Sequence, residues 1–388
     1  MLLELGFRNF FSFREGARVS FRLDSNCPES IAGGRDFVTV MGVKGANAAG
    51  KTHVLKALSF LSRFTASSFS TDPDSLMPFS SFFDNSDPTE LYVEFKAKDG
   101  REYRYEVELT DRKIIRESIY RTLKRSTLYI ERIENEITKP KTLAGIDGLI
   151  LRDNVSIISM FNQYARPELA DVYRFFRGIV TNVGFLGYND IPLDINRAAE
   201  LFHKHPKALD FAKNFIKDCD TGVEDIEIDL VESAQNKIKD GKPEPEKEYR
   251  TFFTHLVDGE RKYTLVEAES SGTKSLFRIL GLYAAVLASG GIAVYDEFDL
   301  HLHPHIIPKI LGLFTDGETN LNGSQLIVSS HDDRIMDILG RYRTILVNKE
   351  ENESYLYRLD EIPGDLVRND RTMLPAYHEG KLGGVPRI

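Results

Sequence analysis

The chain has 388 residues, of which 41% are hydrophobic and 28% charged, and its formal net charge is −9. This length allows two or three domains with a substantial core, and the acidic balance argues against a broadly basic nucleic-acid coat. The two cysteines, Cys27 and Cys219, are too few for a disulfide framework or a cysteine metal cluster, so a reducing cytoplasm is the expected compartment.

The first 24 residues predict a strand, a turn and a second strand. Apolar residues alternate at Leu3, Leu5 and Phe7, stop at 11–16 and resume at 19–23. The segment lacks the long apolar stretch of a secretion signal, and the sequence has no run of about 18 apolar residues that could span a membrane. We therefore expect a sheet edge here and no membrane association.

Residues 45–52, Gly-Ala-Asn-Ala-Ala-Gly-Lys-Thr, are a complete phosphate-binding P-loop between an apolar run at 37–41, the expected feeding strand, and a helix-like stretch at 52–64. Backbone N–H groups can wrap a polyphosphate only where side chains do not obstruct them, which explains the small residues of the loop. We expect the Lys51 ammonium on the β- and γ-phosphates and the Thr52 hydroxyl on Mg²⁺. Asn47 either positions water or the γ-phosphate or is a turn residue suited to a positive φ. The predicted nucleotide-binding residues of this loop are Gly45, Asn47, Ala48, Ala49, Gly50, Lys51 and Thr52.

Between the P-loop and the C-terminal third the pattern changes twice. Residues 91–137 alternate with period two, which predicts an antiparallel meander. Residues 153–220 carry apolar residues at three- and four-residue intervals, which predicts helices. The polar stretch at 235–247, broken by two prolines, predicts an exposed loop. The sequence thus predicts an N-terminal lobe at 1–150 and a helical insertion with an exposed loop at 151–248.

The C-terminal part, predicted to be a lobe at 249–388, begins with two strands around a turn at 258–259 and a helix at 272–288. After it, short apolar strands alternate with helices in the βα rhythm of a largely parallel sheet. The expected fold class is therefore α/β, with a mixed sheet, an antiparallel β subdomain and a helical insertion. The alternating segments are 292–295, 306–314, 326–329, 335–339 and 342–347.

Two carboxylates, Asp296 and Glu297, end the apolar strand expected at 292–295. A strand tip is rigid, so Asp296 can hold Mg²⁺ while Glu297 orients or deprotonates the attacking water. The alternative is an ordinary strand that meets an acidic loop. The preceding P-loop favours the functional interpretation, in which Glu297 is catalytic and Asp296, like Thr52, is a metal ligand.

His331 follows the apolar strand expected at 326–329, a position that suits a neighbouring strand of the same sheet. A histidine there can donate a hydrogen bond to a γ-phosphate oxygen and distinguish triphosphate from diphosphate, whereas a single histidine elsewhere is usually structural. His331 is therefore the second catalytic candidate. The pair His301 and His303 is a weaker candidate for a metal site, because Pro304 as the start of the next helix accounts for this segment.

Residues 269–274, Glu-Ser-Ser-Gly-Thr-Lys, precede a long helix, and small hydroxyl and glycine residues at a helix N-terminus form an anion site. The order of P-loop, serine-glycine segment, Asp-Glu strand and histidine resembles that of the ABC-type ATPase head. In that family the signature of one subunit caps the γ-phosphate that the P-loop of another subunit holds. The resemblance therefore implies a head-to-tail homodimer with ATP between the subunits. It assigns Ser271, Gly272 and Thr273 to the nucleotide, with Thr273 standing where transporters have a second glycine.

The chain resembles the bacterial AAA-type ATPases of abortive-infection and other antiphage systems, of AbiLi and RloA type. The resemblance rests on Arg-Asn-Phe-Phe-Ser-Phe at 8–13, the signature at 269–274, the Leu-His-Pro at 302–304 and Gly-Lys-Leu-Gly-Gly-Val-Pro at 380–386. These ATPases are similar to SMC and OLD-type heads, so the implied fold is a P-loop NTPase of ABC/SMC-head type. About 218 residues without heptads separate the P-loop from the signature, so a compact insertion replaces the coiled coil of SMC proteins.

The resemblance implies an ATPase, with ATP and Mg²⁺ as cofactors, that acts as sensor and switch of an antiphage system. OLD-type nucleases carry a TOPRIM domain after the head, but only 57 residues follow His331. The nuclease or toxin is therefore expected in a separately encoded effector protein. Nucleic acid or a phage protein is the expected trigger, and assemblies larger than the ATP dimer stay open.

Two other functions are compatible with some of the motifs. The first is an SMC-like DNA repair or recombination ATPase, in which basic residues contact DNA phosphates; the plainer alternative is that these residues form solvated surface. Steep salt dependence of DNA affinity would separate this function from a defence switch. The second is a transporter subunit, which would need a membrane partner and loop contacts for which the sequence gives no convincing match. The basic candidates are Arg121, Lys124, Arg125 and Arg132.

Overall fold

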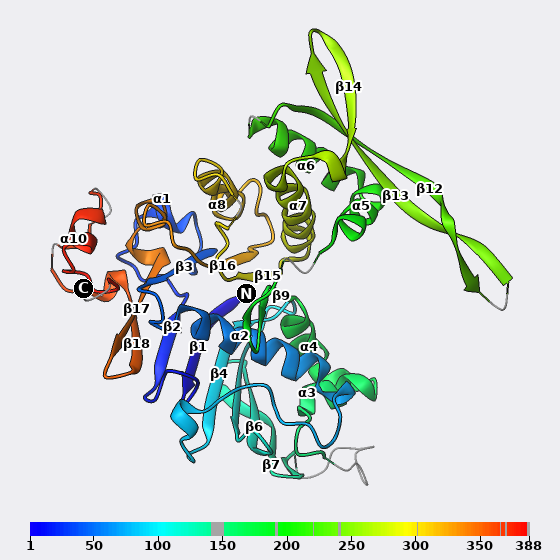
Figure 1. The fold of residues 1–388 in the computed structure, drawn as a ribbon. Coiled ribbons are helices and arrows are strands. Elements are labelled where there is room, and N and C mark those ends of the chain that lie inside the picture. Colours follow the sequence, from blue (N-terminus) through cyan, green and yellow to red (C-terminus); the bar gives the residue numbers. More distant parts are fainter. Residues whose placement is uncertain are drawn as a thin grey trace. The chain divides into compact units, whose positions relative to one another are not determined.

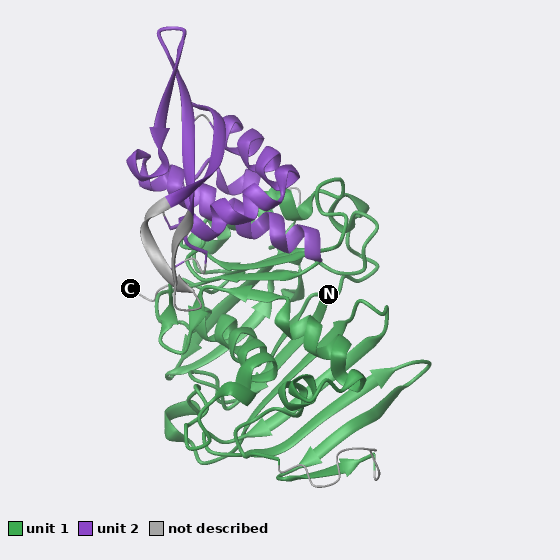
Figure 2. Ribbon diagram, turned by 90° about the vertical axis from the view of Figure 1, so that its right-hand side faces the viewer, with its two compact units in different colours: residues 1–189, 290–298, 311–388 green, residues 190–289, 299–310 purple. Residues whose placement is uncertain are grey.

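The computed structural model divides the chain into two compact units, shown in Figure 2. The first contains residues 1–189, 290–298 and 311–388, and the second contains residues 190–289 and 299–310. The sequence-based boundaries at 150 and 248 stay predictions. The structure describes residues 1–140, 151–190, 193–219, 221–239, 242–300, 302–364, 366–368 and 371–385, with the backbone alone at 233–239 and 242–247.

A six-stranded, largely parallel sheet forms the centre of the first unit (Figure 1). Its first five strands from the β9 edge are mutually parallel, and β18 is antiparallel to β17. The side chains of β15 and β16 are buried along their whole length, as expected for strands covered on both faces. This confirms the βα rhythm. In spatial order the strands are β9 (Ile179–Thr181), β15 (Ile292–Tyr295), β16 (Gln325–Ser329), β3 (Val40–Gly45), β17 (Thr344–Glu350) and β18 (Glu353–Arg358).

A seven-stranded antiparallel sheet provides the second layer of this unit. It confirms both the N-terminal strand pair and the predicted meander. Residues 141–150, which follow β8 in the sequence, lie outside the described residues. In spatial order the strands are β2 (Ala17–Ser20), β1 (Leu2–Arg8), β4 (Thr89–Lys96), β5 (Glu102–Leu109), β6 (Ile114–Thr122), β7 (Ser126–Ile133) and β8 (Glu136–Lys139).

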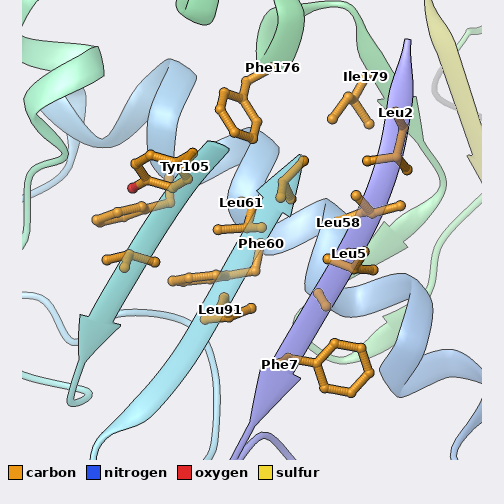
Figure 3. Close-up of a cluster of buried hydrophobic side chains, with 14 of the residues drawn as sticks. Leu2, Leu5, Phe7, Leu58, Phe60, Leu61, Leu91, Tyr105, Phe176 and Ile179 are labelled. Atoms are coloured by element: carbon orange, nitrogen blue, oxygen red, sulfur yellow. The ribbon is translucent and has the colours of Figure 1, made fainter. Parts of the chain in front are cut away.

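Helix α2 (Lys51–Ser67) is packed against the antiparallel sheet by its apolar side chains. Figure 3 shows Leu58, Phe60 and Leu61 of this helix among buried side chains of β1, β4 and β5. Burying each such side chain contributes about 1.5–3 kcal/mol, so the helix that follows the P-loop is firmly held. The other helices of this unit are α1 (Glu29–Ala32), α3 (Ile157–Gln163), α4 (Ala170–Arg177), α9 (Ile335–Leu339) and α10 (Leu374–His378), and α8 (Ile307–Thr315) has residues in both units.

The feeding strand of the P-loop begins three residues later than predicted, at Val40 rather than at residue 37. The backbone of the preceding residues pairs with residues 21–23 instead. The Val38 N–H donates to the Phe21 carbonyl at 2.8 Å, and the Asp36 carbonyl accepts from the Leu23 N–H at 2.9 Å. These residues therefore extend the connection from β2. The apolar run at 37–41 is extended as predicted, but only residues 40–41 of it belong to the parallel sheet.

The region predicted to be helical at 153–220 also contains strands. Strand β9 pairs with β15 in the parallel sheet, and β10 (Val183–Gly184) and β11 (Gly187–Tyr188) form a small hairpin. The interpretation of this whole stretch as helical was therefore wrong at its centre. A strand of three residues is too short to show a period of two, which explains why the pattern missed it.

The second unit combines three helices with a three-stranded antiparallel sheet, which includes the strand pair predicted around 258–259. Its residues 235–239 and 242–247, predicted to be a loop, have strand backbone instead. Pro243 and Pro245 are two residues apart, and β14 pairs only with 252–257, so the prolines lie on a stretch of edge strand, where they are tolerated. Residues 240–241 lie outside the description. The elements are α5 (Ile195–Lys204), α6 (Pro206–Asp218), β12 (Val223–Lys239), β13 (Lys242–Val257), β14 (Glu260–Leu265) and α7 (Ser271–Ser289).

Candidate nucleotide-binding site

The P-loop connects β3 to α2 and has the backbone that a phosphate cradle requires. Ala48 and Gly50 have positive φ values of 62° and 113°, whereas Asn47 does not, so the turn role considered for Asn47 is not observed. A Cβ atom at Gly50 would lie 2.8 Å from the hydroxyl oxygens of Ser12 and Ser354, which leaves room for glycine only. The Lys51 ammonium donates to the carbonyls of Gly45 (2.9 Å) and Ala46 (3.1 Å), so its charge lies within the loop.

Asp296, at the tip of β15, meets the P-loop directly. The Thr52 hydroxyl donates to Oδ2 of Asp296 at 2.7 Å, although the two residues are 244 positions apart. The other carboxylate oxygen accepts from the Ser329 hydroxyl of β16. Two oxygen donors, a hydroxyl and a buried carboxylate, are thereby brought together, and hard oxygen donors are the ligands that Mg²⁺ prefers.

Asn182, directly after β9, holds the backbone of Asp296 in place. Its amide donates to the Asp296 carbonyl at 3.0 Å, and its carbonyl oxygen accepts from the Asp296 N–H at 2.8 Å. Asn182 is buried, so loss of this pair would leave two backbone groups without partners. Sequence reasoning missed Asn182 and Ser329, because only the sheet order places them beside the strand tip.

Glu297 and His331 lie next to each other at the ends of neighbouring strands. Glu297 Oε1 is 3.5 Å from His331 Nε2, and both side chains are about half exposed. Glu297 has a φ of 49°, and its N–H donates to the Ser329 hydroxyl at 2.9 Å, so a strained backbone is fixed from the adjacent strand. The structure therefore brings together the two residues predicted to be catalytic.

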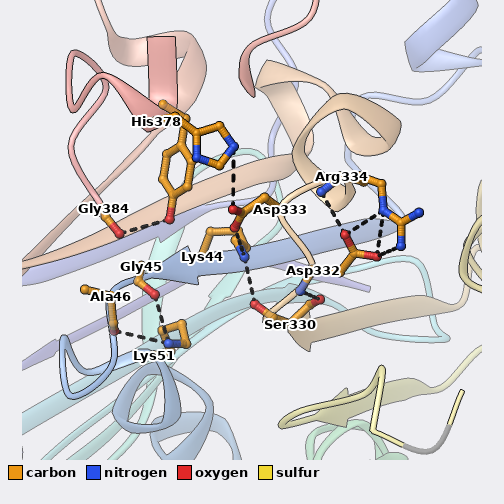
Figure 4. A network of polar contacts seen from close by, with 11 residues as sticks. Lys44, Gly45, Ala46, Lys51, Ser330, Asp332, Asp333, Arg334, His378 and Gly384 are labelled. Carbon is orange, nitrogen blue, oxygen red and sulfur yellow. Dashed lines mark hydrogen bonds and ion pairs between the residues drawn. The ribbon is translucent and has the colours of Figure 1, made fainter. Parts of the chain in front are cut away.

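An ion pair between a buried lysine and a partly exposed aspartate holds the loop that carries His331. The ammonium of Lys44, on β3, lies 2.8 Å from the Asp333 carboxylate and donates to the Ser330 carbonyl at 3.1 Å. Figure 4 shows both contacts. His378 of α10 lies 3.8 Å from the second carboxylate oxygen of Asp333. The side chain of Lys44 is 3% exposed, whereas that of Asp333 is 35% exposed. The loop after β16 is therefore tied to the strand that feeds the P-loop.

We expect the two partners of this ion pair to contribute unequally to the free energy of unfolding. Asp333→Ala leaves the Lys44 ammonium buried without its carboxylate, and we expect it to lower the free energy of unfolding by about 3 kcal/mol. Lys44→Met leaves a carboxylate that water can solvate, so we expect a loss of about 1 kcal/mol. Urea unfolding of both variants measures the difference. Equal losses, or a larger loss in Lys44→Met, would contradict this description of the pair.

The turn after β1 and a serine of β18 contact the P-loop and the first turn of α2. The hydroxyl of Ser12 bonds Nδ1 of His53 at 2.7 Å, and the Ser354 hydroxyl donates to the Ala49 carbonyl at 2.6 Å and lies 2.7 Å from the Ser12 hydroxyl. The Phe11 ring stacks on the imidazole with centroids 4.9 Å apart. Burial lowers the pKa of His53 to about 4, with Lys56 and Lys349 adding to the shift, so the ring is neutral at pH 7.

The signature segment belongs to the second compact unit, at the start of α7. Ser270 caps this helix, because its hydroxyl accepts from the Thr273 N–H at 3.1 Å and lies 2.9 Å from the Thr273 hydroxyl. Thr273 is buried, whereas Ser271 is exposed and Gly272 is half-buried. The nucleotide contacts assigned to Ser271, Gly272 and Thr273 stay predictions. The cap gives Thr273 a structural role where transporters have glycine.

The segment after Glu297 supports no metal site in the part of the chain that the structure describes. His301 lies outside the described residues. Elsewhere in those residues, no group of three or more histidine, cysteine or carboxylate side chains could hold a metal ion. Helix α8 begins at Ile307, three residues after the predicted start at Pro304.

One of the four basic residues considered for DNA contact is buried. Arg132 has no exposed surface and donates to the carbonyls of Glu134, Val155 and Arg152, with Glu117 3.8 Å away. Arg132 therefore neither contacts phosphates nor forms solvated surface. Lys124 and Arg125 are exposed, and Arg121 packs over the ring of Tyr129.

Across the described ranges, no helix has the length and apolar character needed to cross a membrane.

No curated protein matches the chain. Similar solved structures exist. A crystal structure of the SMC head bound to the C-terminal winged-helix domain of ScpA is 13% identical, with a TM-score of 0.50, over 93% of this chain and 99% of that chain. This likeness shows the fold, an SMC-type P-loop ATPase head, and confirms the predicted fold class.

Two further structures have lower scores. The SMC head domain from Thermotoga maritima is 15% identical with a TM-score of 0.46, over 92% of this chain and 98% of that chain. The recombination mediator protein RecF is 10% identical with a TM-score of 0.41, over 92% of this chain and 98% of that chain.

A family model described as "AAA domain, putative AbiEii toxin, Type IV TA system" matches residues 40–337. The match begins at β3 and ends in α9, so it includes the P-loop, the signature, the Asp296-Glu297 strand tip and His331. Well over half of the chain is covered. The chain therefore belongs to this family of AAA-domain proteins and is a P-loop ATPase of the ABC/SMC-like type.

Proposed function

We propose that the chain binds and hydrolyses ATP and that its ATP cycle is the sensor and switch of a bacterial antiphage system of the abortive-infection kind. The effector, a nuclease or a toxin, is a separate protein. The observation that carries the proposal is the 2.7 Å bond between Thr52 and Asp296, which joins the P-loop to the strand tip. The family description, which refers to a toxin and a toxin–antitoxin system, supports the role in defence.

Each residue of the site has a role in this proposal. Lys51 and the backbone of residues 45–52 bind the phosphates, and Thr52 and Asp296 hold Mg²⁺, which offsets the phosphate charge when bound. Glu297 orients the attacking water and accepts its proton. His331, 3.5 Å from Glu297, donates to the γ-phosphate and reports whether it is present. Ser329 and Asn182 keep Asp296 in register with the P-loop.

The switch itself is a dimer in this proposal. The exposed Ser271 and the adjoining N-terminus of α7, a helix of 19 residues, can cap a γ-phosphate held by a second copy of the chain. ATP would then bind more tightly to the dimer than to the single chain, which shifts the population towards the dimer. Hydrolysis removes the shared phosphate and reverses the shift, and the bound effector responds to this cycle.

The defence role is tested by a plaque assay in cells that express the chain with its native gene neighbours. We expect fewer plaques with the wild-type operon, and loss of protection with Lys51→Ala. The matched control is Lys98→Ala, which changes an exposed lysine away from the loop. Unchanged plaque numbers for a panel of phages, combined with duplex binding that weakens steeply with salt, would refute the defence role and favour a DNA-acting ATPase.

A further inference from the structure

The first unit contains a cavity of about 550 Å³ beside α2. The helix residues that line it are spaced by three and four positions, so they share one face of the helix. None of the P-loop residues 45–52 lines this cavity. Its volume is within the range of about 300–1,000 Å³ that is typical of small-molecule sites. Five phenylalanine rings, those of Phe10, Phe11, Phe60, Phe64 and Phe185, are among the residues that line it.

Two cations face this aromatic cavity, and the described residues that line it include no carboxylate. Lys56 is only 9% exposed. Its ammonium lies 4.2 Å from the ring centroid of Phe11 and 6.0 Å from that of Phe185. Within the described residues, its ammonium has no hydrogen bond or ion pair. Arg63, one of the exposed residues at the cavity, contributes the second charge and has a 3.4 Å bond to the Val183 carbonyl.

The Lys56 side chain is largely buried while its ammonium stays reachable from the cavity, so burial removes part of its hydration and no carboxylate at the cavity offsets this cost. Aromatic rings offset only part of this cost, about 0.5–2 kcal/mol for each contact. Burial lowers the pKa of Lys56, and the negative charge of Asp296 opposes this shift. A protein with a net charge of −9 thus keeps two cations, and no carboxylate, among the described residues that line this cavity. An anion placed there would regain the missing Coulomb energy.

We propose that this cavity binds an organic anion, in which an aromatic body packs against the phenylalanine rings and a carboxylate or phosphate pairs with Lys56 and Arg63. Phe11 is shared between the cavity and the P-loop support, since the same ring stacks on His53. The ligand would therefore contact a residue that braces the nucleotide site while leaving residues 45–52 free. The proposal does not depend on the defence role or on ATP hydrolysis.

The test compares two probes of equal shape, 2-naphthoate, which is an anion, and 2-naphthamide, which is neutral. Their dissociation constants are measured by ligand-observed NMR on the full chain. We expect the wild-type protein to bind 2-naphthoate more tightly than 2-naphthamide. Lys56→Met is expected to weaken 2-naphthoate binding by about tenfold, with little effect on 2-naphthamide, because a charged hydrogen bond is lost.

Two variants control for folding and location. Arg63→Met changes an exposed residue and is expected to weaken 2-naphthoate binding by about threefold. Lys98→Met, on a distant turn, is expected to change nothing. The same affinity for both probes, or equal 2-naphthoate binding by the wild type and Lys56→Met, would overturn the proposal.

Competition with nucleotide tests whether this cavity is the place where the adenine base of ATP binds. We expect 2-naphthoate to stay bound when ATP and Mg²⁺ saturate the wild-type protein, and to bind Lys51→Ala with the same affinity. Complete displacement by ATP would mean that the cavity is part of the nucleotide site, and the proposal would be wrong.

Discussion

Replacing Lys51 with alanine is expected to weaken ATP binding by about a hundredfold or more, since charge-assisted bonds to two phosphates are lost. The ammonium lies inside the loop, bonded to the carbonyls of Gly45 and Ala46, and has no role in the apolar core. The variant should therefore fold normally. Isothermal titration with ATP and Mg²⁺ measures the loss, with Lys98→Ala as the matched lysine control.

A wild-type dissociation constant in Lys51→Ala would show that the loop at 45–52 does not hold the nucleotide. A lowered melting temperature together with weaker binding would point to a folding defect, so both are measured on the same sample. Loss of binding with unchanged melting supports the assignment.

Replacing Glu297 with glutamine is expected to lower kcat for ATP hydrolysis by about 10²–10⁴-fold while ATP affinity stays unchanged. Glutamine has nearly the same shape but cannot accept the proton of the attacking water. Steady-state phosphate release and ATP titration give the two values. Glu351→Gln is the matched control, because Glu351 is exposed and has the same φ of 49°.

Hydrolysis by Glu297→Gln at the wild-type rate would show that another residue activates the water. His331, 3.5 Å from the carboxylate, would be the next candidate. Loss of activity in Glu351→Gln as well would mean that the loss in Glu297→Gln is not specific to the carboxylate at the strand tip.

Local motifs explain why part of the site could be predicted from the sequence. The P-loop, Asp296 and His331 each follow a short apolar strand, and parallel strands present their carboxyl ends at one edge of a sheet. Three such strands, β3, β15 and β16, are neighbours or next neighbours in the structure, which brings their terminal residues together. The Thr52–Asp296 and Glu297–His331 contacts follow from this arrangement.

The parts that sequence reasoning missed depend on tertiary structure. Strand β9 has three residues and no readable period, so Asn182 could not be placed beside Asp296. Lys44 lies within an apolar strand, and nothing local shows that Asp333, from another strand end, compensates its charge. Arg132 looked like a surface cation because its buried carbonyl partners come from later in the chain. In each case a partner distant in sequence decides the role.

The central claim, an ATP-driven switch, is tested most directly by the solution mass of Glu297→Gln with and without ATP and Mg²⁺. The chain has a mass of 44.1 kDa, and we expect the variant to form a species of about twice this mass only when both are present. The double variant Lys51→Ala, Glu297→Gln should keep the mass that it has without nucleotide. A mass of Glu297→Gln that does not change under saturating ATP and Mg²⁺ would contradict the switch.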